Sequence, residues 1–161
     1  MKKLNLSKNK QAIIDDEDFI VLSKFIWTYE KSGRSEYASR FIGTPPNRKK
    51  IYLHRQILGA KTGQCVDHKN GDGLDNRRTN LRISTKAQNQ MNQRKQKNRS
   101  SKYIGVSFDK SRNKWVSYYS INKKRFVIGR FENEIDAALA RDEKVKKEFK
   151  EFASLNFEEN R

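Results

Sequence analysis

Residues 67–89 restrict the fold of this chain more than any other segment, and they read DHKNGDGLDNRRTNLRISTKAQN. A loop rich in Asn, Asp and Gly, which favour turns, separates two short segments with strand character, at 64–68 and 81–84. Ser84 or Thr85 can then cap a polar helix, which we expect over residues 86–96. The order strand, loop, strand, helix predicts a small hairpin with a helix behind it.

An Asp-His pair stands where the first of these strands meets the loop. Neighbouring residues of a regular strand point to opposite faces, so Asp67 and His68 can serve one site only at a strand end or a bulge. Asp67 offers a hard oxygen ligand for Mg²⁺ or a similar ion. His68 titrates near neutrality and can take a proton from water. The alternative is that Asp67 caps the turn and His68 is a half-buried polar residue.

Two asparagines can complete a phosphodiesterase site together with Asp67 and His68. Asn89 falls in the second turn of the expected helix, and a helix packed across the strands would turn it toward Asp67, so that both share the ion. Asn80 precedes the return strand, from which it can bond backbone across the loop and orient His68. Alternatively, Asn80 is a turn residue and Asn89 a polar residue of the helix surface. An EF-hand is excluded, because no Glu ends the loop.

The charge of the chain indicates a polyanionic partner. The net charge is +17, and it is densest in residues 61–101, which carry +7 against +6 in residues 1–60 and +4 in residues 102–161. Lysines and arginines that neutralise phosphates release counterions, so nucleic acid is the expected partner, with a basic ribosomal-type protein as the alternative. Because only 34% of residues are hydrophobic, we expect several small modules, each with a thin core.

The expected fold class is α+β. Residues 1–60 predict an α+β module, with strands at 4–6, 11–14, 27–29, 36–41 and 51–53, a helix from Asp15 to about Phe25 and a short helical turn at 54–58. Residues 61–96 hold the hairpin and helix described above, and 93–102 are a basic linker. Residues 103–161 predict an antiparallel sheet of three strands, 103–109, 114–121 and 125–131, then a helix over 134–149.

The linker and the sheet are the expected DNA-binding surfaces outside the hairpin. The linker either is a flexible connection or lies along a DNA groove through Arg94, Lys95, Lys97 and Arg99. One helix leaves one face of the sheet open, and that face is expected to carry basic side chains with Trp115, Tyr118 or Tyr119. The helix is expected to bury a stripe made of Ile135, Ala138, Leu139, Val145 and Phe149.

Residues 67–89 resemble the HNH nucleases, the ββα-metal family, and most of all the branch found in phage- and intron-encoded homing endonucleases, which uses Asp-His, then Asn, then Asn. The resemblance implies that Asp67 and Asn89 bind one Mg²⁺ or Mn²⁺, that His68 is the general base and that Asn80 braces the loop. Asn76 fits the role of Asn80 less well. Arg77, Arg78 and Arg82 are then expected to clamp the DNA backbone. Residues 1–60 resemble the part often joined to such nucleases. His54 and Arg55 are expected there in structure or phosphate contact, and the alternative for His54 is an approach to the nuclease site.

Residues 103–157 resemble the plant APETALA/ethylene-response-factor DNA-binding domain. The matching pieces are YIGVSFD, KWVS, FVIGRF, EIDAALARD and LNF. The resemblance implies a sheet that lies in the major groove of double-stranded DNA. The contacts that it implies are Arg112, Lys114, Trp115, Tyr119, Lys123, Arg125 and Arg130. This chain has Ser107 and Phe108 where the plant domains carry Arg, so their base preference does not transfer.

The sequence as a whole predicts a metal-dependent DNA endonuclease that leaves 5′-phosphate and 3′-hydroxyl ends. The alternatives are a non-catalytic DNA-binding regulator with a relic hairpin, and an RNA-binding protein. One Cys excludes an internal disulfide and a Cys-based zinc site. We expect an intracellular, cytoplasmic protein (in the host cytosol if a phage encodes it) with no membrane partner. A monomer that nicks is the simplest arrangement, while a dimer would allow double-strand breaks.

Overall fold

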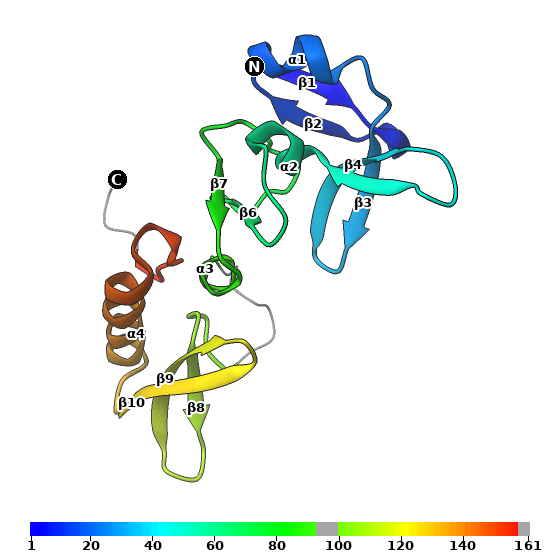
Figure 1. Cartoon of the computed structure of the whole chain (residues 1–161). Coiled ribbons are helices and arrows are strands. Elements are labelled where there is room, and N and C mark those ends of the chain that lie inside the picture. Colours follow the sequence, from blue (N-terminus) through cyan, green and yellow to red (C-terminus); the bar gives the residue numbers. More distant parts are fainter. Residues whose placement is uncertain (93–99, 158–161) are drawn as a thin grey trace. The chain divides into compact units, whose positions relative to one another are not determined.

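The computed structural model describes residues 1–92 and 100–157, which fall into two compact units, Met1–Ser84 and Thr85–Arg161 (Figure 1). Both units combine helices with antiparallel sheets, so the protein is α+β, as the sequence predicts. The linker residues predicted to bind DNA, Arg94, Lys95, Lys97 and Arg99, lie outside the described residues. Within the described ranges, no helix has the length and hydropathy needed to cross a bilayer.

The first unit is built from three small sheets and two α-helices. In chain order its elements are β1 (Lys2–Asn5), a 3₁₀ turn (Ser7–Asn9), β2 (Gln11–Ile14), α1 (Asp16–Leu22), β3 (Thr28–Ser32), β4 (Ser35–Ile42), β5 (Lys49–Tyr52), α2 (Leu53–Leu58), β6 (Cys65–His68) and β7 (Leu81–Ser84). The sheets pair β1 with β2, β3 with β4 and β5, and β6 with β7. Helix α1 ends three residues before the predicted end at Phe25.

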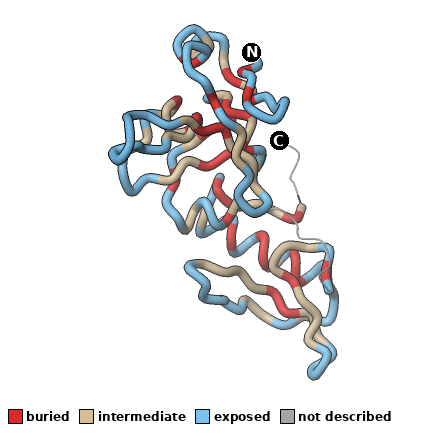
Figure 2. The backbone as a smooth tube through the Cα atoms, turned by 90° about the vertical axis from the view of Figure 1, so that its right-hand side faces the viewer, coloured by how far each residue is buried: buried red, intermediate tan, exposed pale blue. Residues whose placement is uncertain are grey.

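One core joins the N-terminal elements of this unit to the β6–β7 hairpin. Its buried members are Leu4, Leu6, Ala12, Ile14, Leu22, Trp27, Ala38, Leu53, Ile57 and Leu81 (Figure 2). Backbone bonds tie β2 to the loop between β6 and β7, since the Ile13 N–H donates to the Leu74 carbonyl at 2.8 Å and the Asn76 N–H donates to the Ile13 carbonyl at 2.7 Å. Residues 1–60 therefore support the predicted nuclease hairpin directly.

The second unit is one sheet with helices on one face. Its elements are α3 (Lys86–Met91), β8 (Val106–Asp109), β9 (Lys114–Ile121), β10 (Lys124–Phe131), α4 (Glu134–Phe149) and a 3₁₀ turn (Lys150–Phe152), and β9 is the central strand. Ala137 and Ala138 of α4 pack on Val106, and Val145 packs with Met91 of α3.

The buried stripe of α4 agrees in part with the predicted one. Ala138 and Val145 are buried and Phe149 packs against the core as predicted, whereas Ile135 and Leu139 are exposed. Ala137, Arg141 and Asp142 are buried in addition. The small alanines let the helix lie close to the sheet. The buried Arg141 donates from Nη1 to Asp142 and to the Ser154 carbonyl, while its Nε has no hydrogen-bond partner among the described residues.

Candidate active site

The β6–β7 hairpin places Asp67 and His68 at the end of a strand. β6 ends at His68, and the register pairs Asp67 with Arg82 and His68 with Leu81. Both polar side chains are buried, with exposed fractions of 4% for Asp67 and 6% for His68. Burial of a carboxylate costs free energy of folding unless the carboxylate has charged or hydrogen-bonding partners. The burial of Asp67 therefore depends on the partners that the fold gives it.

Asp67 is held by Arg82 from the opposite strand. The guanidinium donates to Asp67 Oδ2 from Nε at 2.8 Å, and its Nη2 lies 2.7 Å from the same oxygen. The Arg82 side chain is only 13% exposed, so this is a shielded ion pair. This ion pair explains how the Asp67 carboxylate can be buried at this position.

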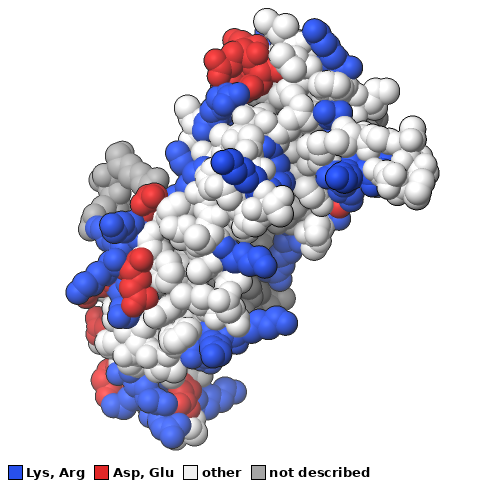
Figure 3. Space-filling model, viewed as in Figure 1, with Lys and Arg blue, Asp and Glu red and all other residues white. Residues whose placement is uncertain are grey.

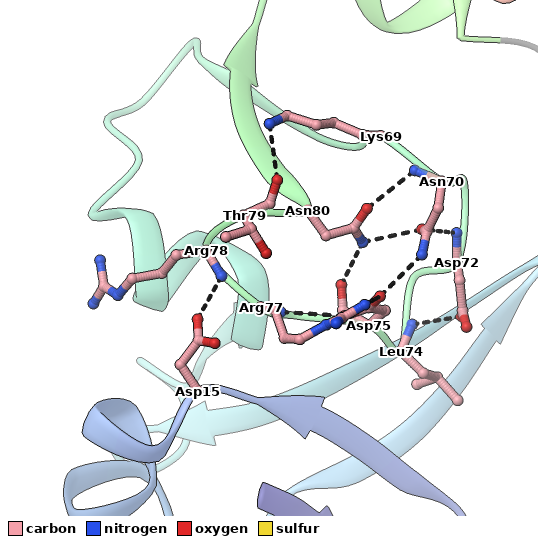
Figure 4. A network of polar contacts seen from close by, with 10 residues as sticks. All are labelled: Asp15, Lys69, Asn70, Asp72, Leu74, Asp75, Arg77, Arg78, Thr79 and Asn80. Atoms are coloured by element: carbon pink, nitrogen blue, oxygen red, sulfur yellow. Dashed lines mark hydrogen bonds and ion pairs between the residues drawn. The ribbon is translucent and has the colours of Figure 1, made fainter. Parts of the chain in front are cut away.

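Asn80 braces the loop between the two strands (Figure 4). Its amide Nδ2 donates to the Asp75 carbonyl at 2.7 Å and to Asn70 Oδ1 at 3.0 Å, while its Oδ1 accepts from the Asn70 N–H at 3.0 Å. The side chain thus spans the loop from one limb to the other. This is the backbone bonding that the sequence analysis expects of a residue just before the return strand.

The two arginines that follow the loop are also paired with acids. Arg77 donates to both oxygens of Asp75, at 2.8 and 2.6 Å, and this bonding lowers the pKa of the Asp75 carboxyl below its ordinary value. Arg78 donates to both oxygens of Asp18 on α1, at 2.9 and 2.7 Å. Arg77 remains 39% exposed and Arg78 45% exposed, so their guanidinium groups also reach solvent.

His68 is buried among aromatic and polar side chains. Its Nε2 is 3.5 Å from Asn76 Oδ1, and Asn76 is fully buried. The His54 ring meets the His68 ring edge to face at 5.1 Å between centroids, and Tyr37 lies 6.2 Å from His68. Burial lowers the pKa of His68 from its ordinary value, which favours the neutral imidazole that a general base requires.

The sequence favours a structural or phosphate-contact role for His54, with an approach to the nuclease site as the alternative, and it ranks Asn76 behind Asn80. The structure brings both side chains beside His68. Periodicity assigns residues to an element, but the approach of α2 to β6 is a long-range contact that no local pattern encodes.

Asn89 belongs to the second unit. A capping box formed by Thr85 and Gln88 begins α3, and Asn89 is exposed on that helix. Met91 anchors the helix in the core of the second unit. The pairing of Asn89 with Asp67 around one ion therefore stays a prediction.

The sheet of the second unit has one face against α4 and one open face. Trp115 packs with Val106 and Ala138, and Tyr119 meets Phe149 at 6.0 Å between ring centroids. Side chains alternate along β9, so these two aromatic residues lie on the covered face and Tyr118 lies on the open one. Alternation in the sequence already predicts that Tyr118 and Tyr119 lie on opposite faces of the sheet. It does not predict which of the two faces the helix covers.

The open face carries a basic and aromatic set. The guanidinium of Arg125 lies 3.6 Å from the centre of the Tyr118 ring and donates to Ser107 Oγ at 3.1 Å. The register places Arg130 and Lys114 on the same face. Arg112 and Lys123 are exposed in the adjoining turns. Lysines and arginines are spread over the surfaces of both units (Figure 3).

The hairpin thus combines a buried Asp-His pair at a strand end with a loop that an asparagine braces, the arrangement that the sequence predicts. In agreement, a family model described as HNH endonuclease matches residues 52–91, about a quarter of the chain. This match supports an HNH nuclease, for which DNA is the implied substrate. No curated protein and no solved structure matches the chain.

HNH nucleases generally use a divalent metal ion, and the donors of this site suit such an ion. No group of three His, Cys, Asp or Glu side chains suitable for a metal occurs within residues 1–92 and 100–157. The site instead offers the Asp67 carboxylate. Mg²⁺ is commonly held by one or two carboxylates, with water and substrate phosphate oxygens as further ligands, so one protein carboxylate fits this chemistry.

Proposed function

We propose that the protein is a metal-dependent DNA endonuclease of the homing type, which hydrolyses phosphodiester bonds to leave 5′-phosphate and 3′-hydroxyl ends. The observation that carries the proposal is the buried Asp67–His68 pair at the end of β6, within the residues that match the HNH endonuclease family. The pair combines a hard anionic ligand with a neutral base, which are the two groups that hydrolysis of a phosphodiester requires.

His68 acts in this proposal as the general base. It accepts a proton from a water molecule whose oxygen attacks phosphorus, and the 3′ oxygen of the DNA leaves. The ring is held by Asn76 and His54, and burial favours its uncharged form. Asn80 positions the base indirectly, because it fixes the loop that follows His68.

Asp67 and Asn89 are the proposed protein ligands of the ion, which is Mg²⁺ or Mn²⁺. When bound, the ion would stabilise negative charge on the phosphate and on the leaving oxygen. Arg82 has a separate task in the protein, since it neutralises the Asp67 carboxylate inside the fold.

The DNA contacts are proposed at two places. Arg77 and Arg78 remain partly exposed beside the loop and can pair with phosphates there. On the second unit, the open face with Lys114, Arg125 and Arg130 and its turns with Arg112 and Lys123 suits double-stranded DNA. We leave Trp115 and Tyr119 out of this set, because both pack on the covered face.

A cleavage assay on a library of duplexes in Mg²⁺ tests the proposal. The wild-type chain is expected to cut, and His68→Ala is expected to bind the same duplex without cutting it. Full cleavage by His68→Ala would overturn the proposed mechanism. Binding by the wild type without cleavage would favour a DNA-binding regulator.

A further inference from the structure

A second histidine lies beside His68, and one of its ring nitrogens has no hydrogen-bond partner among the described residues. His54 lies in the first turn of α2 and is 8% exposed. Its ring stacks on Tyr52, with centroids 5.5 Å apart and 14° between the planes, and lies 5.5 Å from Tyr37. The edge-to-face contact with His68 places it directly beside the proposed base.

One nitrogen of this ring is buried without a partner. Nδ1 of His54 is buried and makes no hydrogen bond to any of the described residues. An unsatisfied buried polar atom is costly, and a phenylalanine would fill the same space without that cost. Because the ring that carries this nitrogen contacts the His68 ring, a group that arrives with the substrate could become its partner.

The ring is uncharged at neutral pH. Burial, together with the neighbouring His68 and Arg55, lowers the pKa of His54 to about 3. A neutral imidazole offers one N–H donor and one acceptor nitrogen. The His54 imidazole can then take part in the reaction through a hydrogen bond, while it stays uncharged near neutral pH.

We infer that His54 is a second substrate-contacting residue of the nuclease site, whose Nδ1 donates a hydrogen bond to an oxygen of the DNA phosphate that is cut beside His68. The inference rests on the proposed nuclease function. It adds to that function a neutral donor on α2, outside the Asp67–Asn89 set, which orients the phosphate for attack by the water that His68 activates.

Three substitutions at this position separate the Nδ1 bond from packing. The amide nitrogen of Asn reaches about as far as Nδ1 of His, the amide nitrogen of Gln reaches about as far as Nε2, and Phe keeps the ring without either nitrogen. Single-turnover cleavage at saturating DNA is expected to fall about 10²-fold in His54→Phe and in His54→Gln, as for loss of one transition-state donor. His54→Asn is expected to keep most of the rate.

The binding affinity of all three variants for DNA in EDTA is expected to stay near that of the wild type. Gln56→Ala, on the same helix, is the control and is expected to cut at the wild-type rate. A wild-type rate in His54→Phe would overturn the inference, because packing would then suffice. Equal losses in all three variants would overturn the assignment to Nδ1.

A measurement on the unaltered protein covers the case in which a variant does not fold. The ¹⁵N resonance of His54 Nδ1 is followed by NMR while an uncut duplex is added in EDTA. A shift on binding is expected, and an unchanged resonance at saturation would overturn the inference. If the wild-type chain itself cuts no duplex, the proposed function fails; if it cuts and the His54 variants behave as packing variants, only this inference fails.

Discussion

The candidate functional surfaces of the two units place their polar residues in opposite ways. In the first unit, Asp67, His68, Asn76 and Asn80 are all buried, and each makes a hydrogen bond, an ion pair or a ring contact within the fold. In the second unit, Lys114, Arg125 and Arg130 of the sheet lie on an open face, where Arg125 stacks above Tyr118. Each arrangement suits a different task.

Burial fixes geometry and shifts the protonation of titrating groups, which is what catalysis needs. Exposure keeps a charge available to a partner at little cost in stability, which is what binding to a polyanion needs. We therefore propose that the general base and the Asp67 carboxylate of the first unit carry most of the chemistry, and that the second unit supplies much of the DNA affinity. The predictions below test this division, from the largest expected effect to the smallest.

The largest effect is expected at Asp67. Asp67→Asn keeps the shape of the side chain but removes the charge proposed to bind the metal ion, so single-turnover cleavage in Mg²⁺ should fall by about 10²- to 10³-fold. Asp72→Asn is the matched control, because Asp72 is an exposed acid of the same loop. Cleavage by Asp67→Asn at the wild-type rate would contradict the proposed role of the Asp67 carboxylate as a metal ligand.

The next effect is acid lability of the first unit. The unfolded His54 gains its proton near pH 6.5, whereas the folded residue needs a pH of about 3. The unfolded state therefore binds more protons between these values, and the stability that is present above pH 6.5 is lost as the pH falls. By pH 4 the loss amounts to about 3 kcal/mol. Urea unfolding followed through the Trp27 indole signal in NMR measures it.

His54→Phe provides the control for this pH dependence. It removes the titrating group and keeps the ring, so the variant should lose less stability between pH 7 and pH 4 than the wild type. An identical loss in both proteins would assign the acid lability to other groups, of which His68 is the first to consider, since burial also lowers its pKa.

A smaller effect is expected from the loop brace. Asn80→Ala removes three hydrogen bonds and leaves buried polar groups unpaired, so the first unit should lose about 2 kcal/mol of stability. Hydrogen exchange of the Asn70 amide, which donates to Asn80 Oδ1, reports this locally. Thr79→Ala, at an exposed position beside it, should leave that exchange rate unchanged. Equal exchange in both variants would contradict the bracing role.

The smallest effect is expected on the open face of the second unit. Arg125→Gln removes one proposed phosphate contact, so the slope of log affinity against log salt should decrease in magnitude by about one. Cleavage at saturating DNA should stay at the wild-type rate. Lys147→Gln, an exposed cation of α4, is the charge-matched control. If Arg125→Gln binds DNA normally but cuts slowly, the proposed division of tasks between the two units is wrong.

Much of this fold can be predicted from local sequence pattern. The predicted bounds of β7, β9 and α4 agree with the structure, because alternation, turn residues and caps mark these elements along the chain itself. The loop role expected for Asn80 also follows from its place just before a strand.

The rest depends on contacts between distant segments. The approach of His54 to His68, and that of Asn76 to His68, require that α2 and the loop pack on β6. The covered position of Trp115 depends on where α4 lies, and the alanines of α4 decide that more than its larger apolar residues do. Local periodicity contains neither fact.

Cleavage of a duplex substrate by the wild-type chain, with Mg²⁺ and then with EDTA, tests the central claim most directly. The account predicts cuts with 5′-phosphate and 3′-hydroxyl ends in Mg²⁺, and no cuts in EDTA while the DNA stays bound. Tight binding with no cut in Mg²⁺ or Mn²⁺ across a full duplex library would contradict it.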